Sequence, residues 1–129
     1  MNVLIVEDSR ALQKRLTEML SKVSGLNLVG QAKCVAEARQ VIEKLHPDLV
    51  ILDLQLADGN GIEVLCETKT NYPLIRFVVF TNQSELQYRQ RCLDLGADYF
   101  LCKSTGAKSL LAISEVLVAD EGYNSDEPS

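Results

Sequence analysis

The sequence predicts an α/β domain in which a doubly wound, five-stranded parallel sheet is covered by five helices. Short apolar runs alternate five times with segments whose apolar residues recur at helical spacing, and this alternation is typical of a parallel sheet with helices on both faces. The clearest run, Leu49–Leu52, is apolar at every position, as in a central strand buried on both sides. The length of 129 residues, 47% of them hydrophobic, suits one domain with a substantial core.

The first strand is expected at Asn2–Val6, a run of apolar residues after one polar residue. Ser9 is a suitable N-cap for the helix that follows, because its hydroxyl can accept a backbone N–H of the first turn. Gly25 is expected to end this helix, since glycine is the usual residue just beyond a helix. Leu26–Ala32 then forms the second strand.

Apolar residues recur at helical spacing within residues 35–45 and predict the second helix there. Pro47 is expected to end this helix. Asp48–Asp53 is the third strand. A loop with two glycines leads from it into a third helix, which extends to about Asn71. The first half of the chain therefore has the regular strand–helix alternation of a doubly wound sheet.

The fourth strand is predicted at Ile75–Thr81, and the fourth helix at Ser84–Leu95, closed by Gly96. A short fifth strand follows at Asp98–Cys102, and a last helix from Thr105 to about Ala119. Right-handed crossovers would give a doubly wound sheet. The strand order 2-1-3-4-5, that of flavodoxin-like sheets, is expected by analogy.

The domain is expected to span residues 1–119. Residues 120–129 are acidic and poor in apolar residues, and they are expected to form a short mobile tail.

No apolar run approaches the roughly 18 residues of a membrane span, and no basic region precedes the first apolar run, so a cytoplasmic protein without a signal peptide or membrane partner is expected. The net charge of −5 disfavours direct nucleic-acid binding by this chain, because phosphates repel a negatively charged surface.

The cysteines are expected to be reduced thiols, because no two of them form a C-x-x-C pair and the single histidine, His46, has no cysteine near it in the sequence. A zinc site is therefore not expected. The four cysteines are Cys34, Cys66, Cys92 and Cys102.

Polar residues that can carry chemistry follow the predicted strands. Glu7 and Asp8 follow the first strand, Asp53 ends the third, Thr81 ends the fourth, and Lys103 comes directly after the fifth. Ligands bind beyond the carboxyl ends of the strands in such sheets. Each residue alone has an ordinary interpretation, as a helix-terminal acid, a turn residue, a capping hydroxyl or a solvated lysine. Their convergence at one edge favours a functional site.

Three carboxylates at one edge repel one another, by roughly 4 kcal/mol for each pair about 4 Å apart at an effective dielectric near 20. Lys103 offsets part of this repulsion, and Mg²⁺, which prefers oxygen ligands and keeps several waters, would offset more. Asp53 is a carboxylate nucleophile able to form an acyl phosphate. Mg²⁺, Lys103 and the Thr81 hydroxyl could each neutralise or bind one phosphoryl oxygen.

With these residues in place, the sequence resembles the receiver domain of bacterial two-component response regulators over residues 1 to about 118. The resemblance is carried by four segments in order, which are VLIVEDS at 3–9, PDLVILDLQLADGNG at 47–61, VVFTN at 78–82 and GADYFLCKS at 96–104.

The resemblance implies a role for each matching residue. Asp53 would be the phosphoacceptor, Thr81 the switch hydroxyl and Lys103 the phosphate-binding lysine. For Mg²⁺, Asp8 would be a direct ligand, Glu7 would act through water and Gln55 would contribute its backbone carbonyl. Phe100 matches the switch aromatic of the family, with a simple core residue as the alternative.

The resemblance also implies how the domain signals. A histidine kinase or phosphotransfer protein, or a small phosphodonor, would phosphorylate Asp53; Thr81 would then move toward the phosphoryl group and Phe100 would turn inward. The surface of the fourth helix, fifth strand and last helix would change and be recognised by a downstream protein, or form a homodimer. The domain would act as a signalling phosphoacceptor whose only catalysis is its own phosphotransfer and dephosphorylation.

Three positions differ from the common family pattern, namely Ala57 and Ser104, where proline is frequent, and Asn82, where a smaller residue is usual. Asn82 and Gln55 could crowd or order the attacking water. An altered lifetime of the phosphorylated state is therefore a hypothesis for this chain.

Other functions remain open at this point. The chain could be a receiver-shaped interaction module that is never phosphorylated, or the receiver fragment of a longer DNA-binding regulator. A phosphohydrolase of the haloacid-dehalogenase type is disfavoured, because that class has a second aspartate where Gln55 stands. A nucleotide-binding domain is disfavoured because no glycine-rich loop follows the first strand.

Overall fold

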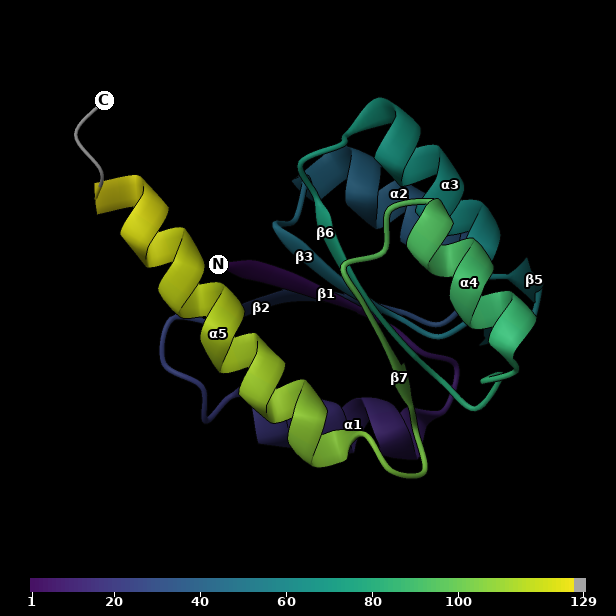
Figure 1. The fold of residues 1–129 in the computed structure, drawn as a ribbon, viewed down its shortest axis with the longest axis horizontal. Helices are drawn as coiled ribbons and strands as arrows, with labels where there is room; N and C mark the ends of the chain where they lie inside the picture. Colours follow the sequence, from purple (N-terminus) through teal and green to yellow (C-terminus); the bar gives the residue numbers. More distant parts are fainter. Residues whose placement is uncertain (127–129) are drawn as a thin grey trace.

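The computed structural model contains a five-stranded parallel sheet between two layers of helices (Figure 1). It describes the backbone of residues 1–126 and the side chains of residues 1–120. The sheet consists of β1 (Asn2–Val6), β2 (Asn27–Ala32), β3 (Leu49–Leu52), β6 (Arg76–Thr81) and β7 (Tyr99–Cys102). A small hairpin after β3 consists of β4 (Gln55–Leu56) and β5 (Gly59–Asn60). The helices are α1 (Arg10–Leu20), α2 (Val35–Leu45), α3 (Ile62–Asn71), α4 (Leu86–Asp94) and α5 (Ala107–Asp126).

The strand order in the main sheet is β2-β1-β3-β6-β7, and all four neighbouring pairs are parallel. Because β6 and β7 are the fourth and fifth strands of this sheet along the chain, the predicted doubly wound fold and its order 2-1-3-4-5 are confirmed. The β4–β5 hairpin was not predicted, since two-residue strands leave no periodic signal in the sequence.

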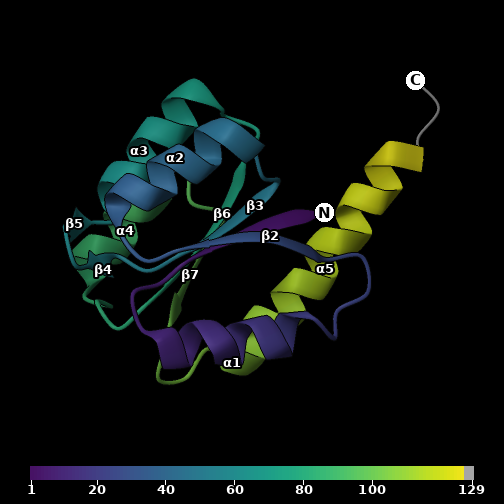
Figure 2. The same cartoon turned by 180° about the vertical axis from the view of Figure 1, so that it is seen from behind.

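The helices cover the sheet unequally, with α1 and α5 on one face and α2, α3 and α4 on the other (Figures 1 and 2). Alternate residues of each strand face opposite layers. Val3 and Ile5 of β1 pack in the α1–α5 core, whereas Leu4 and Val6 pack in the core on the other face. All of Leu49–Leu52 is buried, which confirms a central strand covered on both sides. Complete burial of one such side chain contributes about 1.5–3 kcal/mol.

The start of α1 agrees with the sequence, because the Ser9 hydroxyl accepts the Leu12 N–H at 3.3 Å. Its end does not: α1 stops at Leu20, well before Gly25. Gly25 instead lies in the turn toward β2 with φ +91°, and a Cβ there would lie 2.6 Å from Val118 of α5. Glycine is required at this position by the turn and by the close approach of α5.

Helix α5 continues to Asp126, so the predicted helix end near Ala119 was too early. The acidic composition suggested a tail, but Asp120 pairs with Arg76 of β6 at 3.2 Å, and this ion pair compensates one of those charges. The last part of the predicted mobile tail, residues 127–129, lies outside the described residues, and the domain boundary stays a prediction. Neither α5 nor any other helix in the described part of the chain combines the length and apolarity needed to cross a membrane.

The β4–β5 hairpin supplies the missing N-cap of α2. Cys34, the residue before α2, makes no side-chain capping bond. The Asp58 carboxylate accepts the N–H groups of Val35 at 2.7 Å and Ala36 at 3.1 Å instead. These backbone hydrogen bonds hold the pKa of Asp58 below its ordinary value. A residue five positions after Asp53 therefore ties the loop of the site to α2.

We expect Asp58→Ala to lower the midpoint of thermal unfolding at neutral pH, because α2 loses both capping acceptors. Since the folded-state pKa of Asp58 is depressed, its stabilisation is present above the ordinary carboxyl pKa and is lost as the pH falls through the folded-state value. The difference between Asp58→Ala and the natural protein should therefore shrink in acid. Circular dichroism melts across this pH range measure it, with the exposed Glu18→Ala as the control. A difference that is equal at neutral and acid pH would contradict the capping role.

Candidate functional site

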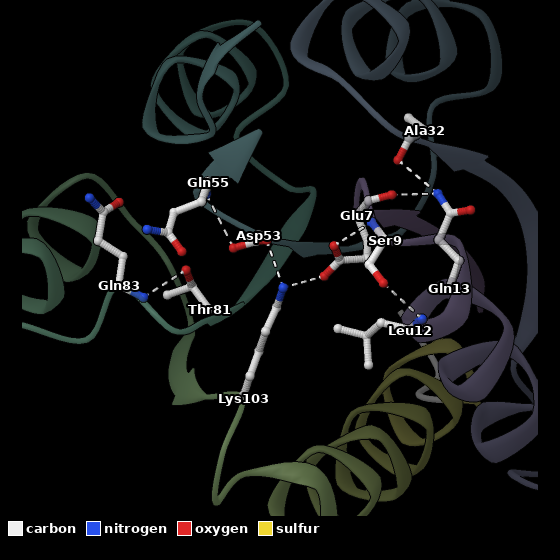
Figure 3. A network of polar contacts seen from close by, with 10 residues as sticks. All are labelled: Glu7, Ser9, Leu12, Gln13, Ala32, Asp53, Gln55, Thr81, Gln83 and Lys103. Atoms are coloured by element: carbon white, nitrogen blue, oxygen red, sulfur yellow. Dashed lines mark hydrogen bonds and ion pairs between the residues drawn. The ribbon is translucent and has the colours of Figure 1, made fainter. Parts of the chain in front are cut away.

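Polar side chains from four segments meet at the carboxyl edge of the sheet (Figure 3). Glu7 and Asp8 follow β1, Asp53 follows β3, Thr81 is the last residue of β6 and Lys103 follows β7. Backbone hydrogen bonds extend the sheet past the strand ends, as in the 3.0 Å bond from the Lys103 N–H to the Thr81 carbonyl. The sheet itself therefore determines the positions of these side chains.

Lys103 is the centre of the polar network in Figure 3. Its Nζ lies 2.7 Å from Asp53 Oδ2 and 2.5 Å from Glu7 Oε1. The second oxygen of each carboxylate has a backbone partner: Glu7 Oε2 accepts the Ser9 N–H at 2.9 Å, and Asp53 Oδ1 accepts the Gln55 N–H at 3.2 Å. With Glu7 only 2% and Asp53 only 3% exposed, these bonds replace part of the lost hydration.

Glu7 and Lys103 both have shifted pKa values in this network. Burial raises the pKa of Glu7, and the hydrogen bonds from Lys103 and Ser9 counteract only part of that effect. Burial opposes the charge of Lys103, but its hydrogen bonds to Asp53 and Glu7 together raise the pKa of the ammonium group above its ordinary value. Lys103 is therefore charged at neutral pH and can offset negative charge at this edge.

The charge of Lys103 does not balance the negative charge of the acidic cluster at this edge. Glu7, Asp8 and Asp53 each place one carboxylate oxygen so that all three oxygens lie within 4.8 Å of one another. One ammonium group faces three carboxylates, and Asp8 is exposed while the other two are buried. Closely spaced oxygen donors with excess negative charge suit a hard divalent cation such as Mg²⁺. The residues present therefore fit the metal that the sequence predicts.

The start of α3 packs directly against the backbone that carries Asp53. The Gly61 N–H donates to the Leu54 carbonyl at 2.8 Å. A Cβ on Gly61 would collide with the backbone oxygen of Asp53. Glycine at this position thus lets the chain reverse immediately beyond the site.

The Thr81 side chain is fully buried, and its Oγ1 accepts the Gln83 N–H at 3.1 Å. Phe100 of β7 pairs with Val79 in the sheet and packs in the α2–α3–α4 core, where it is 7% exposed. The ring is therefore buried in this structure, and its movement on phosphorylation stays a prediction.

Gln55 and Asn82, the residues expected to affect the attacking water, are both exposed. Gln55 contacts Asp53 through its backbone N–H. Asn82 makes no side-chain hydrogen bond to the described residues, whereas its neighbour Gln83 is part of the network around Thr81. Sequence reasoning missed Gln83. A threonine hydroxyl often accepts the backbone N–H two residues further on, and this tendency could have indicated Gln83, which follows Thr81 by two residues.

The fold and site together define a doubly wound α/β domain with a lysine-paired acidic site at the carboxyl edge of its sheet. Residues 3–115 match the family model described as the response regulator receiver domain. The chain therefore belongs to the response regulator receiver family, as its sequence motifs suggested.

Curated relatives include the response regulator protein VraR of Staphylococcus saprophyticus, 32% identical over 84% of this chain and 52% of the relative. The response regulator GacA of Pseudomonas aeruginosa is 28% identical over 97% of this chain and 58% of the relative. The chain spans about half the length of these relatives. Among solved structures, a CheX–CheY–BeF₃–Mg²⁺ complex from Borrelia burgdorferi matches with a TM-score of 0.82 and 28% identity, over 91% of this chain and 89% of that one.

Proposed function

We propose that this domain is a phosphoacceptor switch, in which Asp53 receives a phosphoryl group from a histidine kinase, a phosphotransfer protein or a small phosphodonor with the help of Mg²⁺. The observation that carries the proposal is the buried Asp53 carboxylate, paired with Lys103 at 2.7 Å beside two further carboxylates. A buried nucleophile, a fixed cation and a set of oxygen donors are the parts that phosphoryl transfer requires.

In the proposed reaction, an oxygen of Asp53 attacks the phosphorus of the donor. The new O–P bond forms as the bond between phosphorus and the donor breaks, and the electron pair of that bond leaves with the donor. Lys103 neutralises charge on the phosphoryl oxygens, and the Thr81 hydroxyl donates to another oxygen once it moves toward Asp53.

Four residues would hold the metal: Asp8 and Asp53 as direct ligands, Glu7 through water and Gln55 through its backbone carbonyl. When bound, Mg²⁺ neutralises charge on the carboxylates and on the transferred group. Glu7 contributes a second function here, because its ion pair with Lys103 orients the ammonium group toward Asp53.

The proposed output is a changed surface of α4, β7 and α5 that a downstream protein recognises, or through which two copies pair. The B. burgdorferi CheY is found in a complex with CheX, BeF₃ and Mg²⁺, which supports a protein partner for the present domain as well. Since relatives are about twice as long, we propose that this domain controls an effector in the longer regulator or in a separate partner.

Metal removal tests the proposed chemistry directly. We expect acetyl phosphate with Mg²⁺ to add one phosphoryl group to the protein, and EDTA to abolish the addition, because the excess of carboxylates repels the donor without a cation. Intact mass spectrometry measures the gain. If neither acetyl phosphate nor beryllofluoride binds in the presence of Mg²⁺, the domain is instead an interaction module that works without phosphorylation.

A further inference from the structure

A hydrogen bond joins two loops beside the acidic site. The Nδ2 group of Asn60, in the β4–β5 hairpin, donates to Oε1 of Gln83, in the turn between β6 and α4, at 3.2 Å. The hairpin follows Asp53 and the turn follows Thr81, so the bond connects the loop of the nucleophile with the loop of the hydroxyl. In Figure 3 the Gln83 and Thr81 side chains lie on the same side of Asp53 as Gln55.

The orientation of the Asn60 amide is determined by the start of α3. Gly61, the residue before α3, has no side chain to cap the helix. Asn60 Oδ1 accepts the Ile62 N–H at 2.9 Å and thereby serves as the cap. With its oxygen committed to α3, the amide presents its NH₂ group to Gln83. An amide has both a donor and an acceptor, so Asn60 can make both contacts at once.

Gln83 is held at both its backbone and its side chain. Its N–H donates to Thr81 Oγ1 at 3.1 Å, while its side chain accepts from Asn60. Thr81 is fully buried, so its hydroxyl has little freedom to leave Gln83 unless the turn itself moves. A displacement of the Thr81 hydroxyl toward Asp53 therefore draws Gln83 with it and strains or breaks the bond to Asn60.

We propose that the Asn60–Gln83 hydrogen bond holds the turn after Thr81 in the arrangement of this structure and so makes Gln83 a positioning residue that opposes phosphorylation of Asp53. This inference rests on the proposed phosphoacceptor function. The bond contributes to one of two states of the turn, and removing it shifts the population toward the state in which Thr81 can reach a phosphoryl group.

The test is the affinity of the whole domain for beryllofluoride in the presence of Mg²⁺, measured by titration for three variants. Gln83→Met keeps the length of the side chain but has no strong acceptor. Asn60→Ser keeps a hydroxyl that can cap α3 but is too short to reach Gln83. The third variant combines both changes. Gln87→Met, at an exposed position of α4, is the matched control.

We expect each single variant to bind beryllofluoride about fivefold more tightly, which corresponds to about 1 kcal/mol at 1.4 kcal/mol per tenfold. The double variant should be no tighter than the singles, because both substitutions remove the same bond. Gln87→Met should match the natural protein. A merely structural role would weaken binding rather than strengthen it.

Unchanged or weaker binding by the two single variants would overturn the inference, as would effects that simply add in the double variant. Binding of beryllofluoride by the natural protein distinguishes a failure of this inference from a failure of the proposed function. If the natural protein binds beryllofluoride and the variants behave like it, only the inference fails. If the natural protein itself binds none, both proposals fail.

Discussion

Asp53→Asn is expected to abolish phosphoryl incorporation from acetyl phosphate while leaving the fold intact. The amide lacks the nucleophilic carboxylate oxygen that must form the bond to phosphorus. Asparagine has the same shape and can still accept the Gln55 N–H, and Lys103 retains its ion pair with Glu7. We therefore expect the free energy of unfolding to change by no more than about 1 kcal/mol.

Intact mass after incubation with acetyl phosphate and Mg²⁺ measures the loss, and a chemical melt checks the fold. Asp94→Asn, an exposed substitution on α4, serves as the matched control and should incorporate phosphoryl groups normally. A phosphoryl gain in Asp53→Asn would show that another group is the acceptor, with Asp8 and Glu7 of the acidic cluster as the first candidates. That outcome would remove Asp53 from its proposed role.

The sequence was sufficient for the sheet and for the residues at its carboxyl edge, because both follow from local patterns. Leu49–Leu52 is apolar throughout, and burial on both faces is the direct consequence. Asp53 and Lys103 directly follow strands whose neighbours in the sheet are determined by the doubly wound topology, so their meeting follows from strand ends alone.

Side-chain contacts between residues that are far apart in the sequence could not be predicted in the same way. The capping of α2 by Asp58 joins residues that are 23 and 22 positions apart, and nothing in the local sequence around Cys34 indicates it. The Asn60–Gln83 bond likewise depends on the exact path of two loops. The end of α5 was misplaced because the acidic residues after Ala119 carry no apolar periodicity that would mark a helix, although the structure continues α5 to Asp126.

Lys103→Met is expected to reduce the rate of phosphorylation by about a hundredfold, because one fixed donor to the developing charge is lost. The same substitution should also destabilise the fold. Glu7 and Asp53 are both buried and would lose the cation that lies 2.5 Å and 2.7 Å from them. Removing one partner of a buried ion pair typically costs about 3 kcal/mol at neutral pH in the absence of a metal.

The pH dependence of this loss has a definite sign. Burial already raises the pKa of Glu7 above its ordinary value, and removing Lys103 takes away the main group that opposes this shift. Because the folded state then binds a proton more readily than the unfolded state, the cost of the substitution grows as the pH rises from the ordinary carboxyl pKa through the raised folded-state value. Below that window Glu7 is protonated in both states, and the variant should approach the natural protein in stability.

Two controls separate charge from geometry at Lys103. Lys22→Met removes an exposed cation in the turn after α1 and should change neither the rate of phosphorylation nor the stability. Lys103→Arg keeps the charge but replaces a compact ammonium group by a planar guanidinium group. Its stability should therefore be closer to that of the natural protein than its rate of phosphorylation is. Stopped-flow phosphorylation and chemical denaturation across pH measure both effects. If Lys103→Met is phosphorylated at the natural rate, the charge that stabilises the transferred group must come from elsewhere in the site, and Lys103 would only offset the buried carboxylates.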